Sequence, residues 1–555
     1  MRIFIIALCL CAAGAAQEPA PAASKVPVGR SMVMTKLGIV ATSQPLASQA
    51  GADILSRGGN AVDAAIAANA VLGLVEPHYN GIGGDLFAIY YEAKTKKLYG
   101  LNAGGWAPTG LSAALLKSKG MTRMPQSGVY TITVPGAVKG WEMLQKRFGA
   151  LPLGESLAPA IYYADEGFPV TEVISHYWAS GERKLGADPA TAKTFLPNGH
   201  ALKEGEIFRN PDLANSLRLI AQKGAAGFYT GKTADAILQV MKEKGGTMTA
   251  ADLTEYQPEW VDPISTTYRG WTVYELPPNT QGIAALMMLD QMEQFPIGEY
   301  GLGSTKAMHT MIEAKKLAYA DMLRYVADPK FAKVPTDQML SKANAKARAA
   351  LINPAKANCN VQPSSFSGLT EGNGGDTIYL SVIDKDGNIV SFIQSLYSAF
   401  GSGLVAPGTG IMLHNRGALF QVDPRHPNVI APRKRPFHTL IPGMVLLENR
   451  PFFSFGVMGA DNQPQGHVQV LINLLDFAMD VQQAGESPRF RHAGEEVLLE
   501  SAFGPEVRAA LTQLGHRVAS GFGAWGGYQG IMIDPQTGVL FGGSDPRKDG
   551  LAAGW

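Results

Sequence analysis

A glycine pair followed by an acid and a threonine, Gly374-Gly375-Asp376-Thr377, is the segment of this chain whose residue types most directly suggest chemistry. An apolar run typical of a β-strand follows at residues 378–383. If the bond between Asp376 and Thr377 breaks, Thr377 becomes an N-terminus whose hydroxyl can attack a carbonyl while its own α-amine serves as the base. Threonine also favours strand starts for backbone reasons alone. The segment therefore suggests a self-cleaving precursor, a hypothesis that needs support from the rest of the chain.

Two further segments suit amide chemistry. Residues 433–439 bring cations and hydrogen-bonding side chains together, although alone they are also typical of a solvated basic loop. Residues 455–461 place small residues after a predicted strand, where backbone N–H groups could hold the oxyanion of a tetrahedral intermediate. The alternative for this second segment is an ordinary strand-to-helix turn. Both belong to a site only if they lie near Thr377.

Other kinds of site find little support. Several histidines gather in the last third of the chain, among them five that include no pair with i, i+4 spacing and that no cysteine cluster accompanies: His414, His426, His438, His467 and His492. The chain has no Gly-x-Ser-x-Gly elbow for a serine triad. The glycine-rich segments at 401–403 and 408–410 lack the lysine of a phosphate loop. We therefore expect no metal site and no cofactor.

Helical and strand-like segments alternate along the chain. Residues 48–72 are rich in helix formers, with a glycine pair that can end one helix and Asn60 placed to cap the next. Residues 305–327 predict a long helix with one apolar side. Turn signals at 384–388 and 534–538 lie between apolar runs and predict two hairpins.

The composition is that of a large globular protein. Hydrophobic residues make up 46% and charged residues 17% of the 555 residues. The formal net charge of +1 argues against a strong nucleic-acid binder, so we expect no nucleic-acid partner.

Residues 1–16 are typical of a signal peptide, because Arg2 precedes an apolar stretch and then small residues suited to cleavage. The alternative is a buried N-terminal helix. The apolar stretch is too short for a stable membrane anchor, and residues 17–30 predict a proline-containing linker. Once the signal peptide is removed, Cys359 is the one remaining cysteine, so the mature protein has no internal disulfide. We expect a secreted or periplasmic protein.

Together the motifs resemble those of the γ-glutamyltransferase family, whose members are exported precursors and N-terminal-nucleophile hydrolases. The matching segments follow in order along nearly the whole mature chain: residues 58–65, 80–85, 134–136, 319–321, 375–377, 400–403, 434–436 and 544–547. The resemblance implies a four-layer αββα sandwich. It also implies autocatalytic cleavage between Asp376 and Thr377, which yields a large subunit (31–376) and a small subunit (377–555) that stay associated as one intertwined domain.

The resemblance also implies roles for individual residues. Thr377 matches the nucleophile, and Ser395 matches the hydroxyl residue that positions it. Gly459 and Ala460 match the oxyanion-hole pair. Ala460 replaces the usual glycine but still offers a backbone N–H, provided that the backbone conformation accepts a Cβ.

Substrate recognition departs from the family pattern. Gly104 stands where the family has an arginine for the substrate α-carboxylate, and Leu419 where it has an acid for the α-amine. Tyr397 replaces an asparagine, and His438 and Thr439 replace a serine pair. Each lost charge-assisted hydrogen bond typically costs about 1.5–3 kcal/mol, so binding of a free glutamyl head group should weaken. Arg416 and His438 are the candidates to substitute.

The resemblance implies an enzyme that forms an acyl-threonine from a γ-glutamyl amide such as glutathione. Water, an amine or a peptide then accepts the acyl group, so hydrolase and acyltransferase activity are both expected. One alternative is an acylase for other acyl amides of the glutaryl type, similar to the glutaryl-cephalosporin acylase branch. Another is a catalytically silent exported binding protein on the same scaffold.

Overall fold

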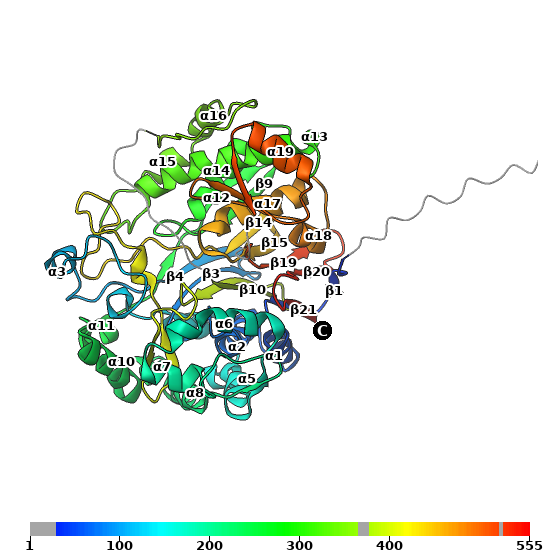
Figure 1. Ribbon diagram of the computed structural model, residues 1–555. Coiled ribbons are helices and arrows are strands. Elements are labelled where there is room, and N and C mark those ends of the chain that lie inside the picture. Colours follow the sequence, from blue (N-terminus) through cyan, green and yellow to red (C-terminus); the bar gives the residue numbers. More distant parts are fainter. Residues whose placement is uncertain (1–28, 365–376, 521–524) are drawn as a thin grey trace, which may run out of the picture. The chain divides into compact units, whose positions relative to one another are not determined.

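The computed structural model describes residues 29–364, 377–520 and 525–555, and residues 32–555 form one compact unit (Figure 1). The expected signal peptide, most of the expected linker and Asp376 lie outside the described residues. Among the described helices, none combines the length and the apolar character needed to cross a bilayer.

Two antiparallel seven-stranded sheets form the centre of this unit. The first has the order β21 (Leu551–Gly554), β2 (Ile39–Thr42), β10 (Ile378–Ile383), β11 (Ile389–Ser395), β3 (Asp85–Glu92), β4 (Lys97–Ala103) and β7 (Glu259–Val261). The second has the order β1 (Val33–Thr35), β20 (Leu540–Ser544), β19 (Tyr528–Ile533), β15 (Arg450–Val457), β14 (Gly443–Leu447), β9 (Trp271–Glu275) and β8 (Ile264–Tyr268). Each sheet thus combines strands from before and after residue 377.

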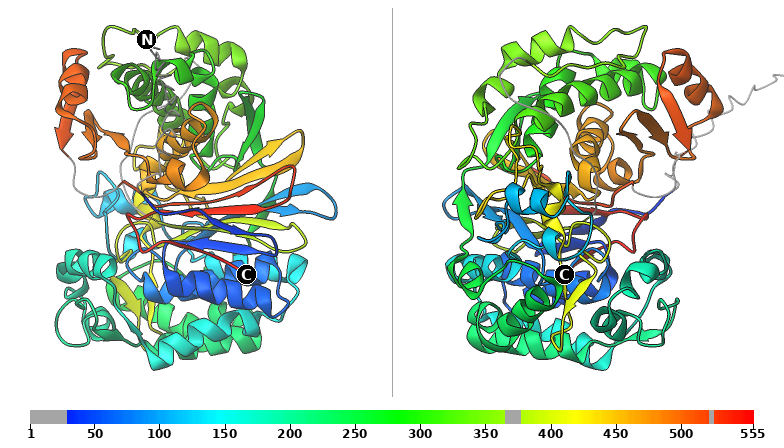
Figure 2. Two further views of the ribbon diagram at one scale, coloured as in Figure 1. Left: turned by 90° about the vertical axis from the view of Figure 1, so that its right-hand side faces the viewer. Right: turned by 60° about the vertical axis from the view of Figure 1, so that its left-hand side comes forward.

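Helices cover the outer face of each sheet (Figure 2). The first sheet is covered by α1 (Pro45–Ser56), α2 (Ala61–Val75) and α4 (Ala137–Phe148), while α5 (Leu153–Glu166) packs on α2 and α8 (Pro211–Lys223) packs on α5. The second is covered by α12 (Gly282–Met292), α17 (Gln463–Leu475) and α18 (Val481–Glu486), while α14 (Thr305–Tyr325) packs on α12. The predicted four-layer αββα sandwich is therefore confirmed.

Smaller elements surround these layers. The other helices are α3 (Ala113–Ser118), α6 (Glu172–Leu185), α7 (Pro189–Phe195), α9 (Ala226–Tyr229), α10 (Gly231–Lys244), α11 (Ala250–Glu255), α13 (Ile297–Tyr300), α15 (Thr336–Met339), α16 (Lys342–Ala349) and α19 (Pro505–Gln513). Three small sheets pair β5 (Phe168–Pro169) with β6 (Ile207–Phe208), β12 (Leu404–Ala406) with β13 (Ile411–Leu413), and β16 (Phe490–Ala493) with β17 (Glu496–Leu499) and β18 (Arg517–Ser520).

The main hydrophobic clusters follow the layers. One joins the first sheet to its helices and includes Ile66 and Val382. A second fills the space between the sheets, where Ile393 and Met444 are buried. A third joins the second sheet to its helices and includes Leu471. Both faces of β10 and β11 are buried, which explains why apolar residues occupy both faces of these strands instead of alternating with exposed polar residues.

The local sequence signals are confirmed. Asn60 caps α2, and its side chain and that of Asp63 exchange hydrogen bonds with each other's backbone N–H groups in a capping box. The predicted long helix is α14, and both predicted hairpins form, between β10 and β11 and between β19 and β20. Cys359 is exposed and forms no disulfide.

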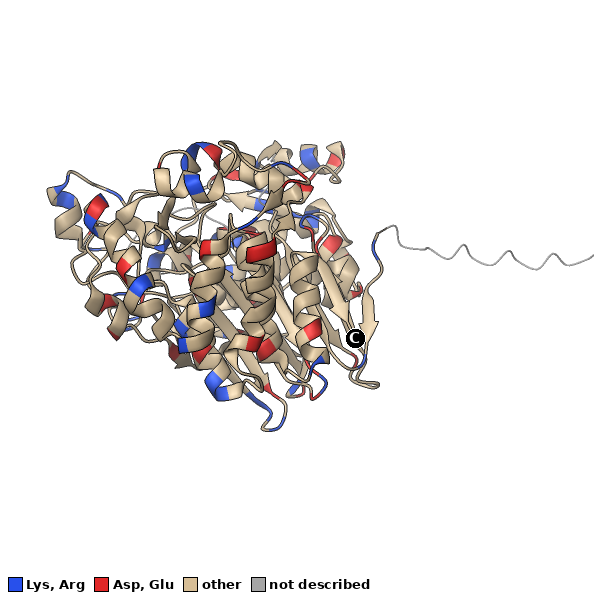
Figure 3. Cartoon of the chain, turned by 90° about the horizontal axis from the view of Figure 1, so that it is seen from below, with Lys and Arg blue, Asp and Glu red and all other residues tan. Residues whose placement is uncertain are grey.

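Charged residues of both signs are interspersed over the helices that Figure 3 shows from below. This distribution agrees with the near-neutral net charge of the sequence.

Candidate active site

Strand pairing places the predicted nucleophile in a row of four positions at one end of the first sheet. Thr377 directly precedes β10, and the β10–β11 register continues to Ser395 as its opposite residue. Ser395 in turn pairs with Asp85 of β3. The β3–β4 register places Gly104 next in the row. Thr377, Ser395 and Asp85 are all fully buried, so side chains from distant parts of the sequence meet here.

Ser395 is fixed by the turn that follows it. Its hydroxyl oxygen accepts a hydrogen bond of 2.7 Å from the backbone N–H of Tyr397. Tyr397 has a φ of +80°, a conformation that a bulky residue adopts only when its surroundings impose it. The turn places the Tyr397 ring against the guanidinium of Arg416, whose central carbon lies 4.6 Å from the ring centroid.

The predicted oxyanion segment forms a strained turn between β15 and α17. Gly459 has a φ of +132°, and Ala460 follows with a φ of +52°. Ala460 thus keeps its Cβ in the left-handed region and opens a short 3-10 helix (Ala460–Asn462). Within the described residues, the N–H groups of Gly459 and Ala460 donate no hydrogen bond. The amide of Gln281 supports the turn by donating to the carbonyl of Ala460 at 2.6 Å and to that of Thr439 at 2.8 Å.

Arg416 is a fully buried cation in the same region. It lies in a 3-10 helix (Arg416–Leu419), and its Nη1 donates to the hydroxyl of Thr439 at 2.8 Å. Its Nε is 4.0 Å from the carboxylate of Asp85. Neither Nε nor Nη2 has a hydrogen-bond partner in the described part of the chain. Burial lowers the pKa of Arg416 to about 10, so it remains charged at neutral pH.

Asp85 connects this cation to two histidines. It accepts hydrogen bonds from the backbone N–H of Gly105 at 2.9 Å and from Nε2 of His438 at 3.2 Å. His414 Nδ1 lies 3.4 Å from the same carboxylate. Burial alone would raise the pKa of Asp85, but its interactions with His414 and His438 outweigh burial and hold the pKa well below its usual value. Asp85 is therefore a buried carboxylate at neutral pH.

His438 is a neutral member of this network. Burial, followed by the nearby charge of Arg416, lowers the pKa of His438 to about 3 although the bond to Asp85 acts in the opposite direction. Its Nε2 carries the proton donated to Asp85, and its Nδ1 accepts from the backbone N–H of Leu440 at 3.3 Å. Both ring nitrogens are therefore already used inside the protein.

Gly104 lies on the row but has no room for a larger side chain. Its N–H donates to the Asn102 side chain at 3.0 Å, and its carbonyl accepts from Arg435 at 2.9 Å. A Cβ at this position would lie 2.9 Å from the ring of Phe87. An arginine here would require Phe87 to move.

Sequence reasoning missed three residues of this region. Asp85 ends the family-matching segment 80–85 but received no role there, and a lone acid at the start of a buried strand was its one local signal. His414 appeared only among scattered histidines, and Gln281 carried no signal at all. All three are recognised only from contacts between distant segments.

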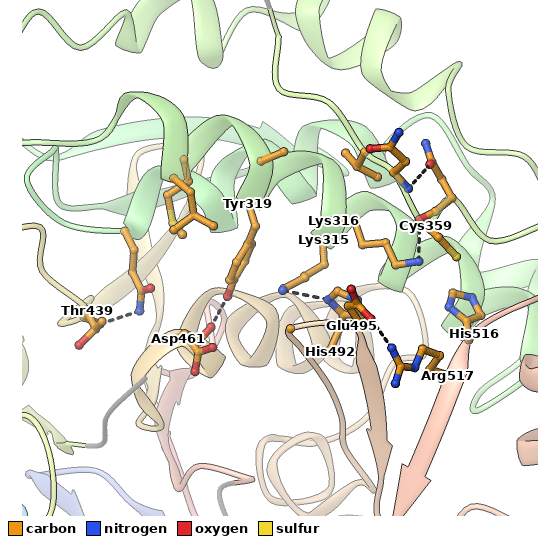
Figure 4. A pocket seen from close by; sticks show the side chains of 18 of the residues that line it. Lys315, Lys316, Tyr319, Cys359, Thr439, Asp461, His492, Glu495, His516 and Arg517 are labelled. Carbon is orange, nitrogen blue, oxygen red and sulfur yellow. Dashed lines mark hydrogen bonds and ion pairs between the residues drawn. The ribbon is translucent and has the colours of Figure 1, made fainter. Parts of the chain in front are cut away.

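A cleft of about 440 Å³ borders the oxyanion segment (Figure 4). Near the site it is lined by Gln281, Leu419, Thr439 and Asp461. Its far end is lined by Lys316 of α14 together with Cys359, His516 and Arg517. Asp461, which lines the cleft, directly follows the turn at 459–460.

Comparisons with known proteins identify the family of the chain. The family model described as gamma-glutamyltranspeptidase matches residues 47–555. The chain is 38% identical to the "Glutathione hydrolase-like YwrD proenzyme" of Bacillus subtilis (strain 168), covering 95% of this chain and 100% of that protein. It is 38% identical to the "Acylase ACY 1 proenzyme" of Pseudomonas sp. (strain V22), covering 92% of each. The crystal structure of a cephalosporin acylase from Bacillus halodurans superimposes with a TM-score of 0.90 at 43% identity, covering 97% of this chain and 99% of that one. The chain therefore belongs to the gamma-glutamyltranspeptidase family.

Proposed function

We propose that the chain is an exported precursor that cleaves itself before Thr377 and then hydrolyses amides, or transfers their acyl groups, with Thr377 as N-terminal nucleophile. The observation that carries this proposal is the pairing register that sets Thr377 opposite Ser395 at the end of the first sheet. The two curated relatives described above are named as proenzymes, which supports cleavage into two associated subunits.

The catalytic cycle follows from the free N-terminus. The Thr377 oxygen attacks the amide carbonyl while the Thr377 α-amine takes the hydroxyl proton. The N–H groups of Gly459 and Ala460 stabilise the oxyanion. Collapse of the intermediate breaks the C–N bond, and the α-ammonium returns the proton to the leaving amine. Water or an acceptor amine then attacks the acyl-threonine by the same steps, which releases the acyl group and restores the hydroxyl.

The acyl pocket favours a group with a distal carboxylate and no α-ammonium. Arg416 offers a buried positive charge with two nitrogen positions that have no hydrogen-bond partner in the described residues, and a carboxylate would satisfy both. Leu419, on the same 3-10 helix, provides no negative charge for an ammonium group. We therefore favour glutaryl-type amides over γ-glutamyl amides such as glutathione. Tyr397 and Thr439 orient Arg416, and His438 fixes the Asp85 carboxylate beside it.

Three anilides test this specificity: glutaryl, γ-glutamyl and valeryl, the last being the glutaryl group with a methyl in place of its carboxylate. We expect the highest kcat/KM for the glutaryl anilide. Replacing Arg416→Gln should lower that value about 10- to 100-fold, the equivalent of a lost charge-assisted bond, and leave the valeryl value nearly unchanged. Arg416→Lys, which retains the charge, is the matched control. A wild-type preference for the γ-glutamyl anilide would overturn the assignment.

A denaturing gel of purified protein tests the nucleophile. We expect two bands, the smaller beginning at Thr377. Thr377→Ala should remain a single inactive chain because it lacks the attacking oxygen, whereas Thr377→Ser should cleave, more slowly. A single uncleaved band from wild-type protein after long incubation would instead favour a catalytically silent binding protein.

A further inference from the structure

Three buried side chains that the amide chemistry does not use meet at the far end of the cleft. His309 and Glu313 are one turn apart on α14, and His516 directly precedes β18. Their candidate ligand atoms all lie within 4.8 Å of one another. Their relative exposures are 1%, 1% and 4%. We propose that His309, Glu313 and His516 bind one Zn²⁺ or a similar late first-row divalent cation, with the fourth ligand supplied from the cleft.

Both imidazoles are oriented as metal ligands require. His309 Nε2 donates to the carbonyl of Asn353 at 2.8 Å, which leaves the lone pair on Nδ1. That lone pair faces His516 Nε2 at 2.8 Å. His516 Nδ1 is buried and has no hydrogen-bond partner among the described residues.

A cation between the rings would replace the hydrogen bond that now joins them. Nitrogen ligands of a tetrahedral zinc ion lie about 3.3 Å apart, given Zn–N bonds of about 2.0–2.1 Å. The rings therefore need to separate by about half an ångström from 2.8 Å. His516 would move its proton to Nδ1, the atom that now lacks a partner, so that Nε2 can bind the ion without net proton loss.

Glu313 supplies the negative charge. Its Oε2 accepts from the backbone N–H of Asn358 at 3.0 Å, which holds the carboxylate in place. Its Oε1 accepts from the ammonium of Lys316 at 2.7 Å. Lys316 lines the cleft, so its side chain can swing outward. A divalent cation would replace the lysine ammonium as the partner of Glu313.

The cleft gives the ion an entry path. His516 lines it together with Cys359, whose Sγ lies 3.8 Å from the carbonyl of Gly515, the residue before His516. Water from the cleft or the Cys359 thiolate can complete a tetrahedral set. Because the ligands come from α14 and from the residue before β18, a bound ion would fasten these elements together at the end of the cleft (Figure 4).

Calorimetric titration of metal-free, full-length protein with Zn²⁺ tests the site, with Co²⁺ absorption reporting the ligand geometry. We expect one ion per chain. His516→Gln and Glu313→Gln should each weaken binding at least tenfold. Lys316→Met should strengthen it, because the competing ammonium is removed. His176→Gln, at an exposed histidine, is the control and should bind like wild type.

A Cys359→Ser variant tests the identity of the fourth ligand. Loss of a sulfur-to-cobalt charge-transfer band in this variant would identify the ligand as the thiolate, and an unchanged spectrum would identify it as water.

Two results would overturn the proposal. One is no binding to either wild type or Lys316→Met, which would leave a hydrogen-bonded histidine pair only. The other is weak binding that none of the ligand substitutions changes. Lys316→Met keeps all three ligands, so it gives a clear answer even if the histidine variants fold poorly. The titration does not depend on amide hydrolysis and can also be run on uncleaved Thr377→Ala protein.

Discussion

At the scale of single residues, Asp85 is a buried carboxylate that connects Arg416 to two histidines. Its carboxylate is shared among a backbone N–H and two histidines, and the guanidinium is no closer than 4.0 Å. The cation is therefore held in place by a counterion that only partly satisfies it. A second carboxylate, brought by a substrate, would compensate the remaining charge without displacing Asp85.

The two residues of the predicted oxyanion pair should respond oppositely to small substitutions. Ala460 holds its Cβ at a φ of +52°, so Ala460→Gly should relieve strain and raise the free energy of unfolding by up to about 1 kcal/mol. Gly459→Ala should do the reverse, because its φ is +132° and a Cβ would lie 3.2 Å from both Asn462 Cβ and Gly526 Cα. We expect Gly459→Ala to lower kcat about 100-fold through a misplaced N–H.

Urea unfolding and steady-state kinetics of both variants check this prediction. Thr377→Ala, which lacks the nucleophile but leaves the turn intact, sets the background rate. Equal kcat in Gly459→Ala and wild type would contradict the role of the turn in holding the oxyanion.

At the scale of elements, the sequence predicted features that local chemistry decides. Asn60 could be recognised as a helix cap, and the hairpin between β10 and β11 could be recognised from its Asp-Gly turn, because both depend on neighbouring residues. The family motifs predicted Thr377 and Ser395, and the register places them opposite each other. Asp85 could not be recognised from the sequence, since its bond to His438 joins residues 353 positions apart. The same holds for the amide of Gln281, 179 positions from Ala460.

At the scale of the whole molecule, the structure buries several neutral histidines. Burial is the largest cause in each case, and it lowers the pKa of these histidines well below 6.5: His78, His426 (to about 4), His438 (to about 3), His492 (to about 2) and His516 (to about 3). In the unfolded chain each would titrate near 6.5. Their burial therefore ties the stability of the fold to pH.

The sign of this dependence is fixed by proton binding. Between about pH 6.5 and 4 the unfolded chain binds protons that the folded chain does not, so stability falls as the pH is lowered. Each buried histidine contributes a slope that rises from about 0.7 kcal/mol per pH unit at pH 6.5 toward about 1.4 below pH 5.5. Glu275 opposes the trend because burial raises its pKa, but a carboxyl acts mainly at the acidic end of the window. The decrease in the free energy of unfolding should therefore be clearest between pH 6.5 and 5.5.

Urea unfolding of the single-chain Thr377→Ala protein from pH 7.5 to 5.5 measures this effect without subunit dissociation. The urea concentration at the midpoint of unfolding should decrease steadily as the pH is lowered below 6.5. His492→Gln should reduce the total loss of stability between pH 7.5 and 5.5 by one histidine's share, about 1.4 kcal/mol, because a glutamine oxygen can still accept the 3.1 Å hydrogen bond from Lys315 without binding a proton. His176→Gln, at an exposed position, should leave the slope unchanged. A midpoint that stays level across this range would mean that the buried histidines are protonated in the folded protein, and the neutral network around Asp85 would then be wrong.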